Sequence, residues 1–247
     1  LWYSWNIRAL HQCGKMKKTI AIVEDEDAIR NNYAELFQRQ GYAVISFPDR
    51  SSAEHAFAGK LPDLVILDIG LEDEIDGGFE LCRNLRSRSA SLPIIFLSAR
   101  DSDFDMVSGL RLGADDYLTK DISLPHLTAR VAALFRRVAA MEHASDTRTL
   151  EIGDLKLDMD RLTTEWKGRK VALTLTELWM LHALALHPGH VKSRNQLMEA
   201  ADIYVDTATV TSHIKRMRQK FNLLDPQFNA IDAVYGIGYR WKDETDR

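Results

Sequence analysis

The chain contains little cysteine, no hydrophobic run of membrane-spanning length and no large excess of one charge. Its 2 cysteines among 247 residues cannot form a framework of disulfide bonds, a content typical of a reducing cytoplasm. No apolar stretch approaches the ~20 residues that cross a bilayer. These absences exclude a disulfide-rich secreted domain and a helical membrane protein, and they predict a cytoplasmic globular protein.

The first residues also lack the features of a secretory signal. Residues 1–15 contain neither a long apolar region nor a small-residue cleavage site. We expect them to be an N-terminal tail that is not native, with Met16 as the natural start.

Length and charge together predict two domains. A chain of 247 residues is long enough for two ordinary domains, each with its own core. The net charge of −4 is divided unevenly, with −5 over residues 16–138 and +1 over residues 148–247. Residues 139–148 lack a sustained pattern. We therefore predict one domain over 16–138, a linker over 139–148 and a second domain over 149–247, with different partners for the two domains.

The first domain alternates short apolar runs with helical patterns. Apolar runs precede Glu24, Asp68, Ser98 and Lys120. Runs of this length between helices are typical of parallel strands that are covered on both faces. A further strand is expected over Tyr42–Phe47, and helices are expected over Asp27–Gln40, Ser52–Ala58, Phe79–Arg86, Phe104–Leu112 and Leu124–Val138. This order predicts an α/β doubly wound, flavodoxin-like domain.

Polar residues follow these strands at the carboxyl ends, where open α/β sheets place their sites. The set comprises Glu24, Asp25, Asp68, Ser98 and Lys120. Taken singly, each residue is an ordinary helix cap or a solvated charge. Taken together, they bring three carboxylates, a hydroxyl and an ammonium to one edge of the sheet. That combination predicts phosphoryl chemistry.

Asp68 is the candidate nucleophile, because a carboxylate can accept a phosphoryl group to give an acyl phosphate. Lys120 would pair with Asp68 and then with the phosphoryl oxygens, as a mobile point charge can. Ser98 would hydrogen-bond a phosphoryl oxygen once the group has arrived.

A cation is needed beside these carboxylates, because the attacked phosphoryl group is itself an anion. Mg²⁺ suits the site, since it prefers oxygen ligands and binds through one or two carboxylates together with phosphate and water. We expect Asp25 and Asp68 to hold the metal. Glu24 would bind the metal or one of its waters, and Gly70 would offer a backbone carbonyl.

The second domain has the pattern of a winged helix-turn-helix. Short antiparallel strands are expected over Leu150–Leu157 and Arg161–Trp166, and two terminal strands are expected within Ile231–Trp241. Three helices lie between them. Thr174 and Glu177 have capping-box spacing at the start of the first helix, and Ser193 and Gln196 have it at the second. Asp206 or Thr207 would cap the third, which runs to about Phe221.

The third helix has an apolar face and a basic strip. Val210, Ile214, Met217 and Phe221 repeat at helical spacing and would face the core. We expect the polar residues to lie largely on the other faces; they are Thr209, Thr211, His213, Lys215, Arg216, Arg218 and Lys220. No acidic residue occurs between Thr207 and Leu224. A local basic strip of this kind predicts contact with DNA phosphates.

Residues 17–138 resemble the receiver domain of two-component response regulators. The segments that carry the resemblance are Ile22–Glu26, Leu64–Asp68, Gly77–Cys82 and Gly113–Lys120. The resemblance implies that Asp68 is the phospho-acceptor, that Ser98 is the switch hydroxyl and that Tyr117 is the switch aromatic. Two departures change the surroundings of the site: Asp121 replaces the proline that usually follows the lysine, and the loop of residues 71–78 is longer and more acidic. Its acids could tighten cation binding, or the loop could simply be solvated.

Residues 150–241 resemble the OmpR/PhoB class of winged-helix effectors. The carrying segments are Leu173–Glu177, Pro188–Arg194, Thr209–Arg218 and Gly236–Trp241. The resemblance implies that Arg216 reads a base edge in the major groove and that Thr211 lies there too. It implies phosphate contacts by His213, Lys215, Arg218 and Lys220. Tyr235 stands where relatives have a wing arginine, so that minor-groove cation is lost.

The resemblance also implies partners. These are a sensor histidine kinase, double-stranded promoter DNA, RNA polymerase and, after phosphorylation, a second copy of the chain. The expected dimer face consists of Asp115, Asp116, Arg130 and Arg137. No enzymatic activity is expected beyond loss of the chain's own phosphoryl group. The acidic loop and residues 119–127 resemble a proteobacterial subgroup associated with dedicated sortase systems.

Three functions are therefore open. The first is a transcription regulator that is switched by phosphorylation. The second is an atypical regulator that binds DNA without phosphorylation, in keeping with Asp121 and the acidic loop. The third is a Mg²⁺-dependent phosphohydrolase with an aspartyl nucleophile. Gly70 argues against the third, because that class needs a second aspartate two residues after the nucleophile.

Overall fold

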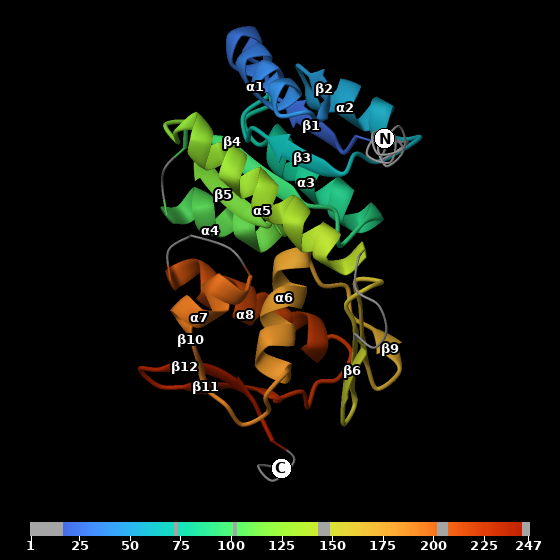
Figure 1. The fold of residues 1–247 in the computed structure, drawn as a ribbon, viewed down its shortest axis with the longest axis vertical. Coiled ribbons are helices and arrows are strands. Elements are labelled where there is room, and N and C mark those ends of the chain that lie inside the picture. The colour runs from blue at the N-terminus through green and yellow to red at the C-terminus, as the bar shows by residue number, and fades with distance from the viewer. Residues whose placement is uncertain (1–16, 72–73, 101–102, 143–148, 202–206, 244–247) are drawn as a thin grey trace, which may run out of the picture.

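The computed structural model describes residues 17–71, 74–100, 103–142, 149–201 and 207–243. Some of the predictions lie outside these residues, namely those for the tail at 1–15, residues 143–148 of the linker, part of the acidic loop and the Asp206 cap. Two domains follow one another along the long axis of the molecule (Figure 1). Within the described ranges, no helix is long and apolar enough to span a membrane.

The N-terminal domain is built on a five-stranded sheet with the order β2-β1-β3-β4-β5. All neighbouring strands are parallel. The strands are β1 (Thr19–Val23), β2 (Ala43–Phe47), β3 (Leu64–Leu67), β4 (Ile94–Ser98) and β5 (Asp116–Thr119). The helices are α1 (Asp27–Arg39), α2 (Arg50–Phe57), α3 (Gly77–Arg88), α4 (Asp103–Leu112) and α5 (Leu124–Glu142). The predicted doubly wound α/β fold is confirmed.

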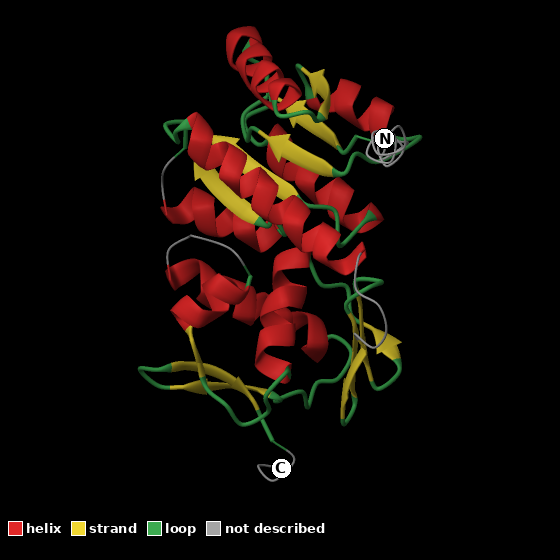
Figure 2. Cartoon of the chain, viewed as in Figure 1, coloured by secondary structure: helices red, strands yellow, loops and turns green. Residues whose placement is uncertain are grey.

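Helices cover both faces of this sheet, as the continuous apolar strands require. On one face, Phe37 of α1 and Val131 of α5 pack with Ile20 and Ile22 of β1. On the other face, the second cluster of buried side chains draws on α2, α3 and α4 and includes Phe57, Leu81 and Leu110. Figure 2 shows the resulting three layers of helix, strand and helix. Helix α5 continues to Glu142, past the predicted start of the linker at residue 139.

The C-terminal domain begins with a four-stranded antiparallel sheet. Its strands are β6 (Thr149–Ile152), β7 (Leu155–Asp158), β8 (Thr163–Trp166) and β9 (Arg169–Lys170), in sequence order. The prediction of a single strand over Leu150–Leu157 is wrong. The chain turns at Gly153, whose φ of +54° lies in the left-handed region that glycine adopts readily, so that β6 pairs with β7 as a hairpin.

Three helices and a terminal hairpin complete this domain. The helices are α6 (Leu175–Ala185), α7 (Arg194–Ala200) and α8 (Thr207–Asn222), and the strands are β10 (Lys192–Ser193), β11 (Ile231–Val234) and β12 (Gly238–Trp241). Both predicted capping boxes are present, at Thr174 with Glu177 and at Ser193 with Gln196. The sheet order β10-β12-β11 places the hairpin beside the helices as a wing. The winged helix-turn-helix prediction is confirmed.

Candidate phosphorylation site and DNA-reading helix

Strand register brings the predicted acidic cluster together. Val23 of β1 pairs with Leu67 of β3 in the parallel sheet. The residues that follow these two strands are therefore neighbours at the carboxyl edge. Glu24, Asp25 and Asp68 each offer a ligand oxygen, and these oxygens lie within 4.8 Å of one another.

Lys120 closes the cluster from the end of β5. Its Nζ lies 2.7 Å from Asp68 Oδ2 and 2.8 Å from Glu24 Oε1. Burial opposes the ammonium charge, but the hydrogen bonds to Asp68 and Glu24 outweigh burial and raise the pKa of Lys120. The predicted pairing of Lys120 with Asp68 is confirmed by this geometry. The lysine therefore stays charged beside the candidate nucleophile.

The donor set fits a hard cation. Burial, together with the charge of Asp68, raises the pKa of Glu24 to about 7, although Lys120 opposes the shift. The three carboxylates of Glu24, Asp25 and Asp68 therefore carry more negative charge than Lys120 alone compensates. Oxygen ligands of this kind are those that Mg²⁺ prefers. The residues present suit a magnesium ion, and the carbonyl of Gly70 as a further ligand stays a prediction.

A glycine that the sequence argument did not single out allows this arrangement. Gly78 lies in the first turn of α3, where its N–H donates to the carbonyl of Ile69 at 2.9 Å. A Cβ at this position would lie 1.9 Å from the backbone oxygen of Asp68. Only glycine lets α3 approach the candidate nucleophile so closely. The Gly77-Gly78 pair was visible in the sequence, but the approach depends on the tertiary fold.

The predicted switch residues lie next to this site and to each other. The backbone N–H of Arg100 donates to Ser98 Oγ at 3.3 Å, and the hydroxyl of Tyr117 donates to the carbonyl of Arg100 at 2.9 Å. The Tyr117 ring is buried, and its centroid lies 6.1 Å from that of Phe96. Burial raises the pKa of Tyr117 to about 12, so the hydroxyl keeps its proton. Tyr117 therefore occupies an inward position, tied to the loop that follows Ser98.

The described acids of the long loop are paired with arginines. Glu74 Oε2 lies 2.7 Å from Arg50 Nε, and Asp76 Oδ1 lies 3.1 Å from Arg100 Nη1. Neither acid belongs to the cluster that could hold a metal. Asp121, which replaces the usual proline, accepts a hydrogen bond from the Thr119 hydroxyl. These contacts favour a solvated, ion-paired loop over a loop that tightens cation binding.

Helix α8 has the predicted core face. Val210, Ile214, Met217 and Phe221 are all buried. Thr211 and Lys215 are exposed, as expected. Tyr235, at the tip of the wing, is exposed over its whole side chain.

The prediction that Thr209, His213 and Arg216 lie on the solvent side of α8 is wrong for this structure, because all three are buried. Helices α4 and α8 pack against each other (Figure 1), so the N-terminal domain covers part of the expected DNA-reading face. Hydrophobic periodicity within one helix cannot reveal a surface that another domain covers.

Arg216 and Lys220 are held by Glu177 of α6. Arg216 Nε lies 3.3 Å from Glu177 Oε1, and Lys220 Nζ lies 2.6 Å from Glu177 Oε2. Arg216 Nη2 also lies 2.6 Å from His213 Nδ1. Burial, with the charges of Arg216 and Lys220, lowers the pKa of His213 well below its usual value. His213 is therefore neutral here and carries no charge for a phosphate.

Arg218 is also engaged within its own domain. Its Nη2 donates to the carbonyl of Ile231 at 2.9 Å, and its guanidinium lies 5.8 Å from the centroid of the Tyr239 ring. The hydroxyl of Tyr239 donates to Thr211 Oγ1 at 3.3 Å. These contacts attach α8 to both wing strands, β11 through Ile231 and β12 through Tyr239. They leave Lys215 as an exposed cation of the predicted set.

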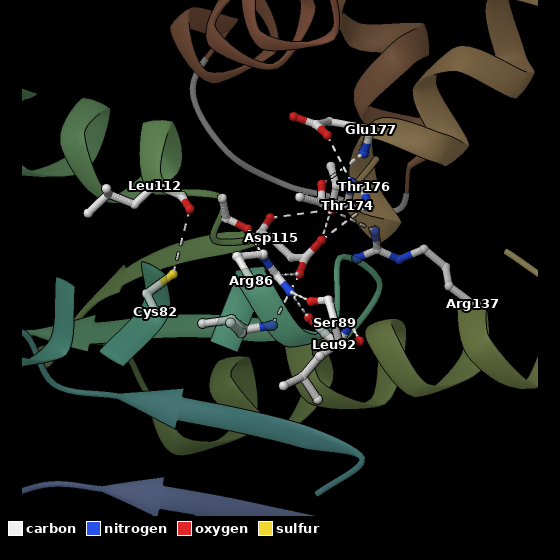
Figure 3. A network of polar contacts seen from close by, with 12 residues as sticks. Cys82, Arg86, Ser89, Leu92, Leu112, Asp115, Arg137, Thr174, Thr176 and Glu177 are labelled. Atoms are coloured by element: carbon white, nitrogen blue, oxygen red, sulfur yellow. Dashed lines mark hydrogen bonds and ion pairs between the residues drawn. The ribbon is translucent and has the colours of Figure 1, made fainter. Parts of the chain in front are cut away.

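The residues of the predicted dimer face have partners within the chain. Asp115 Oδ2 lies 2.8 Å from Arg86 Nη2, and Asp116 Oδ2 lies 3.8 Å from Arg130 Nη1. Arg137 Nη1 donates to Thr176 Oγ1 of the C-terminal domain at 3.3 Å (Figure 3). Their role in pairing two copies stays a prediction.

Comparison with known proteins supports the predicted class of both domains. Residues 20–132 match the response regulator receiver domain, and residues 168–241 match the family described as transcriptional regulatory protein, C terminal. The transcriptional regulatory protein CreB of Escherichia coli (strain K12) is 36% identical over 228 residues, which cover 90% of this chain and 97% of CreB. The phosphate regulon transcriptional regulatory protein PhoB of Rhizobium meliloti is 40% identical over 229 residues, which cover 91% of this chain and 98% of PhoB.

The chain therefore belongs to the OmpR/PhoB family of two-component response regulators. It is a transcription regulator whose receiver domain is a target of phosphorylation and whose second domain, the effector domain, binds DNA. A solved structure of a RitR mutant has a TM-score of 0.72 and 23% identity, and the match covers 92% of this chain and 99% of that one. That likeness supports the fold. The sortase-associated subgroup stays a prediction.

Proposed function

We propose that Asp68 accepts a phosphoryl group from the phosphohistidine of a sensor kinase. The Asp68 carboxylate oxygen attacks the phosphorus, the new P–O bond forms, and the P–N bond breaks with its electron pair returning to the imidazole. Mg²⁺ held by Glu24, Asp25, Asp68 and the Gly70 carbonyl would neutralise charge on the transferred group. Lys120 is already 2.7 Å from Asp68 Oδ2 and would follow the phosphoryl oxygens.

The switch would act through two neighbours of Asp68. Ser98 is proposed to donate its hydroxyl to a phosphoryl oxygen, and rotation of its side chain toward that oxygen would break the hydrogen bond that Oγ accepts from the Arg100 N–H. Tyr117 donates to the Arg100 carbonyl, so a movement of the loop that follows Ser98 would also move the Tyr117 ring and α4. Because α4 packs on α8, phosphorylation of Asp68 would in this way change the position of the DNA-reading helix.

The effector domain is proposed to bind promoter DNA after α8 has left α4. Arg216 would then exchange its contact with Glu177 for a base edge, and Thr209 and Thr211 would lie in the same groove. His213, Lys215, Arg218 and Lys220 would contact phosphates, and Tyr235 would contact DNA from the wing. Binding as a dimer and contact with RNA polymerase belong to the same proposal, as does a location in the cytoplasm. No catalytic turnover of an external substrate is proposed.

The convergence of Asp68, Glu24 and Asp25 with Lys120 carries this proposal. Incubation with a small phosphodonor and Mg²⁺ tests it, with intact mass as the readout. We expect a phospho-adduct in the wild-type chain and none in Asp68→Asn. Omission of Mg²⁺ should also prevent the adduct. An adduct that persists in Asp68→Asn would place the acceptor elsewhere.

A further inference from the structure

A receiver carboxylate makes its hydrogen bonds in two domains at once. Asp115 Oδ1 accepts the backbone N–H of Thr176 at 3.1 Å and its hydroxyl at 3.1 Å. Asp115 Oδ2 accepts the N–H of Ile94 at 3.1 Å and Arg86 Nη2 at 2.8 Å. Both Asp115 and Thr176 are buried. Figure 3 shows Asp115 between Arg86 of α3 and the first turn of α6.

The Thr176 contact adds an acceptor to the cap of an effector helix. The first N–H groups of a helix have no partner within the helix. In α6, Glu177 accepts the N–H of Thr174 at 2.9 Å, and Thr174 Oγ1 accepts the N–H of Glu177 at 3.3 Å. This capping box does not reach the N–H of Thr176, and Asp115 of the receiver supplies the acceptor. A negative charge at a helix N-terminus is also favourable.

The receiver holds this carboxylate in place without help from the effector. Arg86 Nε donates to the carbonyl of Gly113 at 2.7 Å, and Arg86 also bonds the carbonyl of Leu92. The guanidinium is thus fixed on the backbone beside β5, and it fixes Asp115 in turn. A carboxylate that is already oriented loses little freedom when the helix docks.

A second receiver side chain meets the same threonine. Arg137 of α5 donates to Thr176 Oγ1 at 3.3 Å, while the Thr176 hydroxyl donates to Asp115. The hydroxyl therefore has both an acceptor and a donor from the receiver. Asp115 and Arg137 are also two of the residues predicted to pair one receiver with another.

We infer that Asp115 and Arg137 form a docking surface for the first turn of α6, and that Thr176 is the effector residue which fits this surface. Docking here covers α8 with α4 and occupies two residues of the predicted dimer face. The docked arrangement and receiver pairing through this face therefore exclude each other. The inference deepens the proposed function and rests on it, because exposure of α8 changes DNA binding only if α8 reads DNA.

Thr176→Asp tests the docking surface. An aspartate in the first turn suits α6, but it places a carboxylate against Asp115. The matched control is Thr176→Ser, which keeps the hydroxyl. The first readout is the radius of gyration of the unphosphorylated full chain, by small-angle X-ray scattering. We expect a larger radius for Thr176→Asp and the wild-type radius for Thr176→Ser. An unchanged radius in a folded Thr176→Asp chain would overturn the inference.

The second readout is affinity for a duplex selected from a random-sequence library by the phosphorylated wild-type chain. Loss of hydrogen bonds to a charged group should raise the affinity of unphosphorylated Thr176→Asp by roughly tenfold. The added negative charge cannot produce this gain, because it repels DNA. Thr176→Val, which removes only the hydroxyl, should show a smaller gain and serves if the aspartate variant fails to fold. Equal affinity of Thr176→Val and wild type would then overturn the inference.

The two readouts separate the docking inference from the proposed function. A larger radius without any DNA binding, before or after phosphorylation, supports the docking surface and contradicts the function. DNA binding that phosphorylation strengthens, with no effect of either Thr176→Asp or Thr176→Val on radius or affinity, supports the function and overturns the docking surface.

Discussion

The guanidinium of Arg216 lies against the carboxylate of Glu177, with 3.3 Å between Nε and Oε1. Arg216 is the residue expected to read a base edge, and Glu177 is the capping residue of α6. The same carboxylate also holds Lys220, at 2.6 Å from its Nζ. One buried acid therefore fixes the start of α6 and two cations of the DNA-reading helix.

Glu177→Gln should destabilise the effector domain. The amide can still accept the N–H of Thr174, but it leaves Arg216 and Lys220 without a compensating charge. Removing one partner of a buried ion pair costs about 3–5 kcal/mol. Chemical denaturation would measure the change. Glu199→Gln, on the exposed face of α7, is the control and should stay within about 0.5 kcal/mol of wild type. Equal unfolding free energies for Glu177→Gln and wild type would contradict this account.

The contribution of Glu177 should depend on pH in a defined direction. Burial alone would raise the pKa of Glu177, but the charges of Arg216 and Lys220 outweigh it and lower the pKa below 4.5. A carboxyl with a lowered pKa stabilises the folded state above its ordinary pKa, and this stability is lost as the pH falls through the folded value. The difference in unfolding free energy between wild type and Glu177→Gln should therefore shrink below pH 4.5. A difference that stays constant as the pH falls would argue against this ion pair.

Gly78→Ala should disrupt the phosphorylation site. Its Cβ would lie 1.9 Å from the backbone oxygen of Asp68, so α3 or the Asp68 backbone must move. We expect a loss of ~3 kcal/mol or more in stability and a smaller fraction of chains that carry the phospho-adduct. Gly59→Ala is the control, since nothing lies within 4 Å of its Cβ. Thermal unfolding and intact mass measure the two effects. Normal adduct formation in Gly78→Ala would show that this close approach is dispensable.

Gly109→Ala should test the inward position of Tyr117. Alanine normally stabilises a helix over glycine by about 0.5–1 kcal/mol. At this position its Cβ would lie 2.9 Å from the Tyr117 ring and 3.0 Å from Phe96. We therefore expect a loss of about 1–2 kcal/mol in wild type and a smaller loss, or a gain, in a Tyr117→Ala background. Denaturation of the four chains measures this coupling. If the effects of Gly109→Ala and Tyr117→Ala on the unfolding free energy were additive, the Tyr117 ring would not lie against Gly109.

Local sequence signals predicted much of the fold. The capping boxes at Thr174 and Ser193 marked helix starts correctly, because a cap depends on residues only three positions apart. The acidic cluster was also predictable, since parallel strands end at one edge. Gly153 broke a predicted strand because its left-handed φ turns the chain within a segment of alternating apolar and charged residues that otherwise looked continuous.

The environment of α8 could not be predicted in this way. Thr209 and His213 are polar residues at positions that a helical pattern leaves outside the core, yet both are buried in a helix on which α4 of the other domain packs. The contact between Asp115 and Thr176 joins two domains, and nothing in either local sequence requires it.

The most direct test of the account is the DNA affinity of the full chain before and after phosphorylation. The probe is the selected duplex, and the compared chains are wild type and Asp68→Asn, each with and without a small phosphodonor and Mg²⁺. We predict that phosphodonor strengthens binding by wild type and leaves Asp68→Asn unchanged. Equal affinity of wild type before and after phosphorylation would contradict the claim that the receiver controls the DNA-reading helix.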